Sequence, residues 1–439
     1  MCGEDEGAKR RRGSRPDSPA QTGVLGVVMS GLDDIGRRRV LKAGMGAAAL
    51  ALGGGTPFLN SRRAFAQAAK LKSEQLRTIG LSVTVQDRIL AAFQKESGVG
   101  GTTGTAATFP DAQTKILSGS TDYDCWECIG ERLPAITQSD KADPVPVSAL
   151  KNWNSIRDTF TKVNPKWPEK AQIVGQIWKD EAHTTLWMVP TVYNYDSVGY
   201  NPDKVSAEEA NTWSAIFDKK WKGKSGLNTD PLIAFGEAIM AMNTMGMLDV
   251  KNPGNPSAKE IDEASKFLIS KKKEGQFRAL WGDFGELVNY MASGEMVVCD
   301  AWQPAVMAVK AQGKPCKYAV PKEGYRAWTI GITPLVGSPN HDAVIAYADY
   351  WLSGPPGITV SEQGYYSPTT KIKEVMDPAR YAFWYEGKPW TGKPDRGIKD
   401  GDLRDGGSLA TRAANVAYWH QWPDEYDHLV QKWDEFLNA

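Results

Sequence analysis

The chain has 439 residues, of which 41% are hydrophobic and 24% are charged, a composition typical of a globular protein long enough for two domains. Lys plus Arg and Asp plus Glu each number 52, so the chain is formally neutral. Residues 1–66 hold 11 basic and 6 acidic side chains, which leaves 41 basic and 46 acidic ones in the remainder. This mildly acidic body argues against nucleic acid or an anionic membrane as the partner.

A basic stretch followed by a short apolar one lies near the N-terminus. Residues 36–42 (GRRRVLK) precede residues 43–52 (AGMGAAALAL), a run too short to span a bilayer. Small residues at Ala64 and Ala66 fit a signal-peptidase site, so we expect a signal peptide over 1–66 and a periplasmic mature protein. The arginines and the weakly apolar run resemble a twin-arginine signal. The stretch before Met29 is unlike a signal peptide, so Met29 is the expected initiator; the alternative to a signal is a buried Ala-rich helix with a basic cap.

Strands and helices are expected to alternate in the rest of the chain. Residues 78–85 (TIGLSVTV) predict a strand, and residues 87–97 show the apolar spacing of a helix that Gly98 ends. Further helices are expected at 112–117, 235–247, 261–273, 341–352 and 410–437, and further strands at 123–129, 185–200 with a break at Pro190, 296–302 and 318–320. The charged, Pro/Gly-rich stretch 387–407 is expected to be a surface excursion. This alternation predicts an α/β fold.

Motifs of common enzyme classes are absent from the sequence. It contains neither a G-x-S-x-G nucleophile elbow nor an H-E-x-x-H zinc motif. Gly223-Lys224-Ser225 resembles the end of a phosphate-binding loop, but Asp218 stands where that loop requires glycine. The four histidines have no metal-ligand spacing: His183, His341, His420 and His428. We therefore expect no catalytic residue, no metal and no cofactor.

Four cysteines lie beyond the expected signal peptide. Cys125 and Cys128 form a C-x-x-C motif, which is compatible with a small disulfide, a redox motif or half of a zinc site. Its position at the end of a predicted strand argues against redox catalysis, which needs a helix N-terminus. Cys299 and Cys316 lie on consecutive predicted strands. Local pairing, Cys125 with Cys128 and Cys299 with Cys316, is one hypothesis; four buried thiols are the other.

The sixteen tryptophans all lie beyond residue 66. Most are expected in the core, but aromatic faces also bind cations and planar ligand groups. Trp302 and Trp328 follow strand-like runs, and open α/β sheets bind ligands beyond the ends of their strands. Both tryptophans are therefore candidates for a ligand site as well as for the core.

Short segments from about residue 78 to the C-terminus resemble the spermidine/putrescine-binding family of extracellular solute-binding proteins. They follow the family order and spacing: 93–98 (FQKESG), 123–124 (YD), 188–190 (MVP), 198–201 (VGYN), 213–224 (WSAIFDKKWKGK), 229–231 (TDP), 292–295 (ASGE), 318–324 (YAVPKEG) and 364–368 (GYYSP). Each segment is short, so the resemblance depends on their order over the whole mature chain.

The resemblance implies two α/β lobes with crossover hinge strands and a ligand cleft between the lobes. One lobe is expected at 78–197 plus 330–375, the other at 198–329 plus 376–439. Such lobes close around a small-molecule solute by hinge motion, and the closed form docks on an ABC permease in the inner membrane. We therefore expect a monomeric binding protein of an importer and no enzyme; the alternatives are an exported enzyme and a periplasmic sensory binding protein.

The resemblance also implies ligand residues. Trp302, Trp328 and Tyr365 fall on aromatic positions that clamp a polyamine chain, and Asp230 falls on an acidic contact. The other expected contacts are Ser82, Thr84, Glu131, Tyr193 and Arg326.

Two departures from the family pattern concern the charge of the ligand. Ile233 and Ile330 stand where the family places carboxylates against amines, and a buried ammonium without a carboxylate is costly. A linear di- or triamine is therefore disfavoured, and an amine-bearing, zwitterionic or anionic solute is the other hypothesis. Polyamine binding stays open if Glu127, Glu131 or Asp196 supplies the missing charge.

Overall fold

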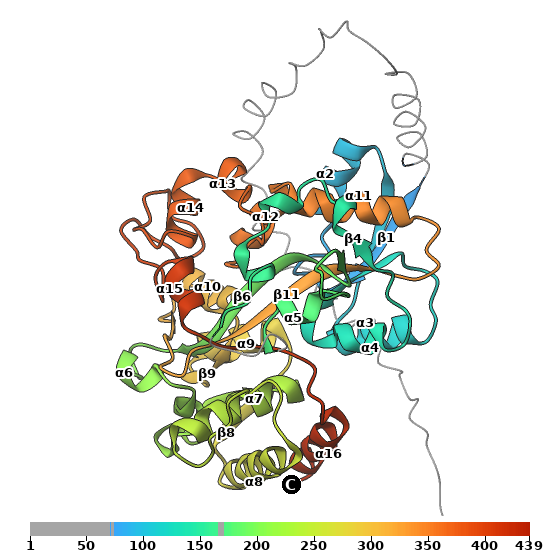
Figure 1. Cartoon of the computed structure of the whole chain (residues 1–439). Coiled ribbons are helices and arrows are strands. Elements are labelled where there is room, and N and C mark those ends of the chain that lie inside the picture. The colour runs from blue at the N-terminus through green and yellow to red at the C-terminus, as the bar shows by residue number, and fades with distance from the viewer. Residues whose placement is uncertain (1–70, 72–73, 166–170) are drawn as a thin grey trace, which may run out of the picture. The chain divides into compact units, whose positions relative to one another are not determined.

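The structure is a computed structural model that describes residue 71 and residues 74–165 and 171–439. The expected signal peptide over 1–66, its cleavage after Ala66 and the initiator Met29 lie outside these residues and remain predictions. Helices and strands alternate along the described chain, as the sequence indicates (Figure 1).

Three parallel strands and two helices begin the described chain. Strand β1 (Gln75–Gly80) pairs in parallel with β2 (Gly100–Thr105) and with β3 (Cys125–Ile129). Helix α2 (Asp87–Ser97) connects β1 to β2, and α3 (Phe109–Leu117) connects β2 to β3. The predicted helix over 87–97 is confirmed at both ends.

Local signals explain where these helices begin and end. α2 ends because Gly98 adopts the left-handed conformation, with a φ of 76°. α3 begins before the predicted residue 112, because Thr108 and Asp111 form a capping box. β2 was not expected, since its sequence GGTTGT combines glycines with only moderate strand formers.

Two long antiparallel strands connect the two halves of a ten-stranded sheet (Figure 1). β6 (Val189–Tyr200) and β11 (Tyr325–Pro334) pair over most of their length. β6 then continues beside β9 (Val298–Ala301), whereas β11 continues beside β3. Pro190 does not break β6 as predicted: it lies within the strand, opposite Gly331 and beside an irregularity in the pairing.

The other half of the sheet repeats the parallel arrangement. β7 (Ser225–Asn228) pairs in parallel with β8 (Phe277–Trp281) and with β9. Helices α7 (Pro231–Thr244) and α8 (Ala258–Lys273) follow β7, and α9 (Phe284–Ser293) follows β8. The strand order is β2-β1-β3-β11-β6-β9-β7-β8, with β10 beside β6 and β12 beside β11.

Two of the remaining helices have 12 residues each, and the other elements are shorter. The predicted helix over 341–352 is confirmed as α11. The bounds of these remaining elements are α4 (Leu133–Thr137), β4 (Val145–Pro146), α5 (Val174–Ile177), β5 (Thr185–Leu186), α6 (Ala207–Ala210), α10 (Gln303–Ala311), β10 (Lys317–Tyr318), α11 (His341–Leu352), α12 (Pro355–Glu362), α13 (Ile372–Val375), α14 (Pro378–Trp384), α15 (Leu409–Ala414), β12 (Val416–Trp419) and α16 (Tyr426–Leu437).

Buried side chains form two large cores and a smaller one. The first core gathers β1, β3, α2 and α11 around Trp126 and Trp351, and the second gathers α7, α8 and α16 around Trp213. Side chains of 387–407 also enter the first core, for example Trp390 and Ile398. This stretch, predicted as a surface excursion, is thus partly buried because its apolar side chains pack on α14 and neighbouring helices.

The predicted C-terminal helix over 410–437 is wrong. The segment contains helix α15, strand β12 and helix α16. The aromatic and β-branched residues VAYW form β12 because they pair in parallel with β11, a partner that is distant in sequence. Pro423 lies between β12 and α16, where it cannot donate a backbone hydrogen bond.

The four described cysteines are free and buried. Cys125 and Cys128 lie three residues apart in extended β3, so their Cα atoms are about 10 Å apart, beyond the roughly 7 Å limit for a disulfide. Cys299 lies on β9 and Cys316 precedes β10, and β6 separates these two strands because Gly199 pairs with both. Neither predicted pairing forms, which leaves the alternative of buried thiols.

Two kinds of feature are absent from the part of the chain that the structure describes. No helix there combines the length and the apolar composition that a bilayer span requires. No group of three or more His, Cys, Asp or Glu side chains there could hold a metal ion.

Candidate functional site

The crossover strands β6 and β11 present two different faces. In an antiparallel pair, directly opposite residues point to the same face, and successive residues alternate. Asp196 lies opposite Arg326 and Asn194 lies opposite Trp328, so these four side chains share one face. Tyr193 and Tyr195 point to the other face. One face is therefore ionic and the other is aromatic.

Asp196 is the centre of the ionic face. Its carboxylate accepts hydrogen bonds from Arg326 Nη2 at 2.9 Å and from Trp328 Nε1 at 2.8 Å. The hydroxyl of Tyr318 lies 3.3 Å from the carboxylate and 2.9 Å from the carbonyl oxygen of Ala301, and its one hydrogen can be donated to either. Burial raises the pKa of Asp196, and the Arg326 guanidinium opposes that rise. Asp196 and Arg326 thus form a buried ion pair with further hydrogen bonds, as buried charges require.

Two more carboxylates lie beside this ion pair and are poorly compensated. Glu237 comes from α7 and Asp300 from β9, and both are fully buried. Glu237 Oε1 lies 3.6 Å from Arg326 Nε, and Asp300 Oδ1 accepts a hydrogen bond from Trp281 Nε1 at 3.0 Å. Burial raises the pKa of both carboxyl groups, and the charge of Asp300 raises that of Glu237 further. Both oxygens of Glu237 and Oδ2 of Asp300 have no hydrogen-bond partner among the described residues. Such a pair can hold a cation.

Aromatic side chains surround the carboxylates. Trp328 contacts Tyr365 edge to face, with ring centroids 5.2 Å apart. Trp302 contacts Trp281 in the same way at 4.8 Å, and Trp281 in turn binds Asp300. The structure therefore brings the expected residues Arg326, Trp328 and Tyr365 to Asp196, and Trp302 to the neighbourhood of Asp300. Trp328 is buried in the first core, whereas Trp302 is half-buried.

Two polar bridges join the turn after β3 to the other half of the protein. Arg132 Nη2 donates to Asp230 Oδ2 at 2.9 Å, and Asp230 is the N-cap of α7. The neighbouring Glu131 has an oxygen 3.1 Å from Nδ1 of His420, which follows β12. Glu131 and Asp230, both expected as ligand contacts, therefore face side chains of the protein.

Most of the chain matches a known protein family. Residues 88–383, two thirds of the chain, match the family described as bacterial extracellular solute-binding protein. The chain belongs to this family. The putrescine/agmatine-binding protein of Pseudomonas aeruginosa is 20% identical to this solute-binding protein over 274 residues, which cover 60% of this chain and 69% of that protein.

Solved structures show the fold of this solute-binding protein. A putative spermidine/putrescine ABC transporter protein from Listeria monocytogenes superposes with a TM-score of 0.61 at 16% identity, covering 83% of this chain and 98% of that one. The agropinic-acid complex of AgtB from A. tumefaciens R10 gives 0.57 at 15% identity, covering 84% and 99%. The α/β two-lobe periplasmic-binding-protein fold expected from the sequence is thereby confirmed.

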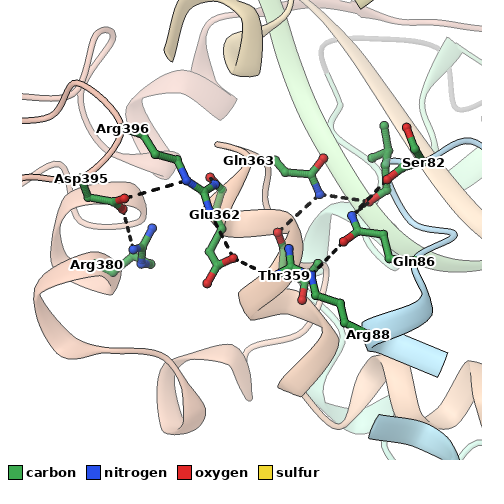
Figure 2. A network of polar contacts seen from close by, with 10 residues as sticks. Ser82, Gln86, Arg88, Thr359, Glu362, Gln363, Arg380, Asp395 and Arg396 are labelled. Carbon is green, nitrogen blue, oxygen red and sulfur yellow. Dashed lines mark hydrogen bonds and ion pairs between the residues drawn. The ribbon is translucent and has the colours of Figure 1, made fainter. Parts of the chain in front are cut away.

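Three expected contacts lie outside the ionic cluster of the solute-binding protein. Tyr193 is on the aromatic face, where its ring packs on Tyr366 and Phe160. Thr84 is buried, and Ser82 is exposed on the turn after β1. Figure 2 shows how this turn is held: Gln86 Nε2 donates to the carbonyl of Ser82 at 3.0 Å. No hydrogen bond or ion pair between described residues links these three to Asp196, and their role as contacts stays a prediction.

Figure 2 also shows that the turn belongs to a network around α12. Gln363 Nε2 donates to the carbonyl of Val83 at 3.1 Å. Glu362 forms ion pairs with Arg88 at 3.0 Å and with Arg396 at 3.4 Å. The network fastens the turn after β1 and the 387–407 stretch to the same helix.

Buried arginines stabilise the aromatic face. Arg412 stacks on Tyr325 at 4.4 Å and donates to the carbonyl of Tyr195 at 2.7 Å. Arg404 stacks on Tyr366 at 4.4 Å and hydrogen-bonds its hydroxyl, next to the expected contact Tyr365. Burial lowers the pKa of Arg404 to about 10. We interpret Arg404 as the residue that positions the turn bearing Tyr365.

Glu237 and Asp300 were not predicted as site residues, although each carries a recognisable signal in the sequence. Glu237 interrupts the apolar run LIAFGEAIMAM of α7, and Asp300 interrupts the apolar run VVCDAW of β9. A lone acid in a segment that is otherwise buried needs a partner or a function. The missed partners Arg132 and His420 carry no such signal.

Proposed function

We propose that this protein is the ligand-capturing component of an ABC-type importer, which acts in the periplasm and delivers a small polar solute to a permease in the inner membrane. The observation that carries the proposal is the presence of two buried carboxylates, Glu237 and Asp300, because three of their four oxygens lack a hydrogen-bond partner among the described residues. Buried carboxylates of this kind destabilise a protein that has no ligand, so binding is a better reason for them than folding. We propose further that the protein is a monomer, is not an enzyme and needs no cofactor.

Hinge motion between two lobes is the proposed route of capture. β6 and β11 each pair with strands of both halves, which makes them suitable as hinge strands. We assign 78–197 plus 330–375 to one lobe and 198–329 plus 376–439 to the other. The packing of Trp384 and Trp390 in the first core favours moving 376–398 to the first lobe. The Arg132–Asp230 bridge would open when the lobes separate.

The relatives favour a small charged solute without naming one. One is called a putrescine/agmatine-binding protein, another is complexed with agropinic acid, and a third is described as a GABA receptor. These ligands differ in size and in charge, but each of them carries amine groups, acid groups or both. We therefore propose a small, polar, amine-bearing, zwitterionic or anionic solute, held near Trp302, Trp328 and Tyr365.

Native mass spectrometry of protein purified without added ligand tests the function. A binding protein that closes on its solute is expected to carry a small molecule that is lost on unfolding. Small-angle scattering with the recovered solute should then show a smaller radius of gyration, because the lobes close. Protein that retains nothing, and whose radius is unchanged by polyamines, amino acids and sugar acids, would refute the proposal.

A further inference from the structure

Charge is distributed unevenly over the chain beyond residue 66. Of its 41 basic and 46 acidic side chains, the short segments 218–224 and 271–278 hold eight basic and two acidic ones, which leaves 33 and 44 for the rest. The mildly acidic net charge therefore conceals a strongly basic region. Because a protein approaches a charged partner through its local field, net charge alone does not exclude an anionic membrane.

The fold brings the two basic segments together. β7 and β8 pair in parallel, so the residues just before each strand reach the same edge of the sheet. The backbone N–H of Gly223 donates to the carbonyl of Gln276 at 2.8 Å. Lys222 packs over Gly275, where a Cβ atom would lie 3.6 Å from its Cε. The cations of the two segments thus form one surface, the basic patch: Lys219, Lys220, Lys222, Lys224, Lys271, Lys272, Lys273 and Arg278.

Half of the basic patch has no anionic partner within the protein. Lys220, Lys271 and Arg278 pair with carboxylates, and Lys272 donates to carbonyls at the end of α16. The other four cations are exposed and form no ion pair with a described residue: Lys219, Lys222, Lys224 and Lys273. The dipole of α8 favours cations in its last turn, but it does not account for the three lysines of 218–224. Neighbouring like charges repel each other, so an external anion would stabilise this surface.

The basic patch lies away from the candidate solute site. Its residues precede the first residue of β7, whereas Asp230 follows the last one. The four residues of the strand separate the two ends by about 13 Å. A partner that binds the patch therefore leaves Asp230 and the neighbouring carboxylates free.

We propose that the basic patch binds the anionic headgroups of a phospholipid membrane. Seven of its eight cations are lysines, which act as point charges, whereas recognition of individual carboxylates typically uses the planar fork of arginine. Clusters of four to eight basic side chains on a surface are typical of binding to anionic lipid. The proposal goes beyond the proposed function and rests on it only for the choice of membrane, the inner membrane that holds the permease. A membrane contact would raise the local concentration of the binding protein around the permease.

Co-sedimentation with lipid vesicles tests the proposal on the natural protein. Vesicles of phosphatidylcholine with about 30% phosphatidylglycerol are compared with vesicles of phosphatidylcholine alone, in about 20 mM salt. We expect the partition coefficient to be at least about tenfold higher with phosphatidylglycerol. The difference should vanish in about 0.5 M salt, because salt screens exposed charges. Equal partition into the two kinds of vesicle at low salt would overturn the proposal.

Two variants of equal net charge test the residues. The first replaces the four unpaired lysines of the basic patch with glutamine. The control does the same to four exposed lysines elsewhere: Lys95, Lys115, Lys151 and Lys393. All eight side chains are exposed, so both variants should keep the thermal midpoint of the natural protein. We expect the first variant to lose at least about tenfold in partition and the control to change by less than about twofold. Equal losses would overturn the role of the patch, because net charge alone would then explain the binding.

A soluble polyanion distinguishes a membrane from an acidic protein partner. Retention on immobilised polyaspartate without binding to vesicles would overturn the proposal in favour of an acidic protein. Solute capture does not involve the patch, so the first variant should still retain a solute in native mass spectrometry. If the natural protein retains a solute and ignores the vesicles, the solute-binding function stands and only the membrane contact is wrong.

Discussion

Replacing Glu127 with glutamine should make the protein more stable at alkaline pH and less stable at acidic pH. Glu127 lies on β3 and is fully buried. Its Oε1 accepts hydrogen bonds from Thr78 at 2.9 Å and from Tyr347 at 3.2 Å, whereas its Oε2 has no partner among the described residues. Burial raises the pKa of Glu127 from 4.5 to about 7. No basic side chain among the described residues forms an ion pair with the charge that develops above that pH.

The direction in which stability changes with pH follows from the number of protons bound in the folded and unfolded states. Between pH 4.5 and about 7 the folded protein holds a proton on Glu127 that the unfolded chain has released. The stability that depends on the neutral form is therefore complete below pH 4.5 and is lost as the pH rises through 7. The difference between the two pKa values corresponds to a loss of about 3 kcal/mol.

Glutamine at position 127 removes this loss of stability, but it introduces a smaller loss of its own. Its carbonyl can keep the hydrogen bonds from Thr78 and Tyr347, but its amide takes the place of the unpartnered Oε2. An unpaired buried amide costs about 1 kcal/mol. We therefore expect Glu127→Gln to be about 2 kcal/mol more stable than the natural protein near pH 8 and about 1 kcal/mol less stable near pH 4.

Urea unfolding followed by tryptophan fluorescence at a series of pH values measures the two free energies. Glu96→Gln is the control, because Glu96 is exposed on the same half of the protein and should leave the pH dependence unchanged. Curves for Glu127→Gln and the natural protein that stay parallel from about pH 5 to about pH 8 would refute the reasoning.

Three further predictions concern the site and the cysteines. Trp328→Ala should lower the free energy of unfolding by about 3–5 kcal/mol, because Trp328 is a core residue. Trp302 is half-buried, so Trp302→Ala should mainly weaken ligand binding. Equal losses of stability in the two variants would contradict this distinction. Burial raises the pKa of Asp300 to about 7, so Asp300→Asn should be more stable than the natural protein above pH 7, where the natural carboxyl group loses its proton in a buried position. Urea unfolding at several pH values checks this, and a stability difference that is independent of pH would contradict it. The denatured mature protein should titrate four thiols without prior reduction, because the structure has no disulfide among its described cysteines; two or fewer would restore a pairing.

Local sequence was sufficient to predict a segment whose structure depends mainly on its own residues. Helix α2 has the predicted bounds because its apolar spacing and Gly98 lie within a dozen residues, and α11 follows its apolar pattern in the same way. The α/β class and the two-lobe fold follow from the alternation of such segments together with the family resemblance. The resemblance also named Trp302, Trp328, Tyr365 and Arg326 as ligand contacts, and that role stays a prediction.

Only the tertiary structure decided which charges meet. Glu237 and Asp300 lie on different elements, and only the packed structure shows which of their oxygens lack a hydrogen-bond partner among the described residues. Asp230 was expected to meet a ligand, but Arg132 from the turn after β3 reaches it. β12 was hidden in a predicted helix because a strand is stabilised by its neighbour, here β11, and not by its own residues. Electrostatic partners and strand partners are long-range properties, so residue order alone does not determine them.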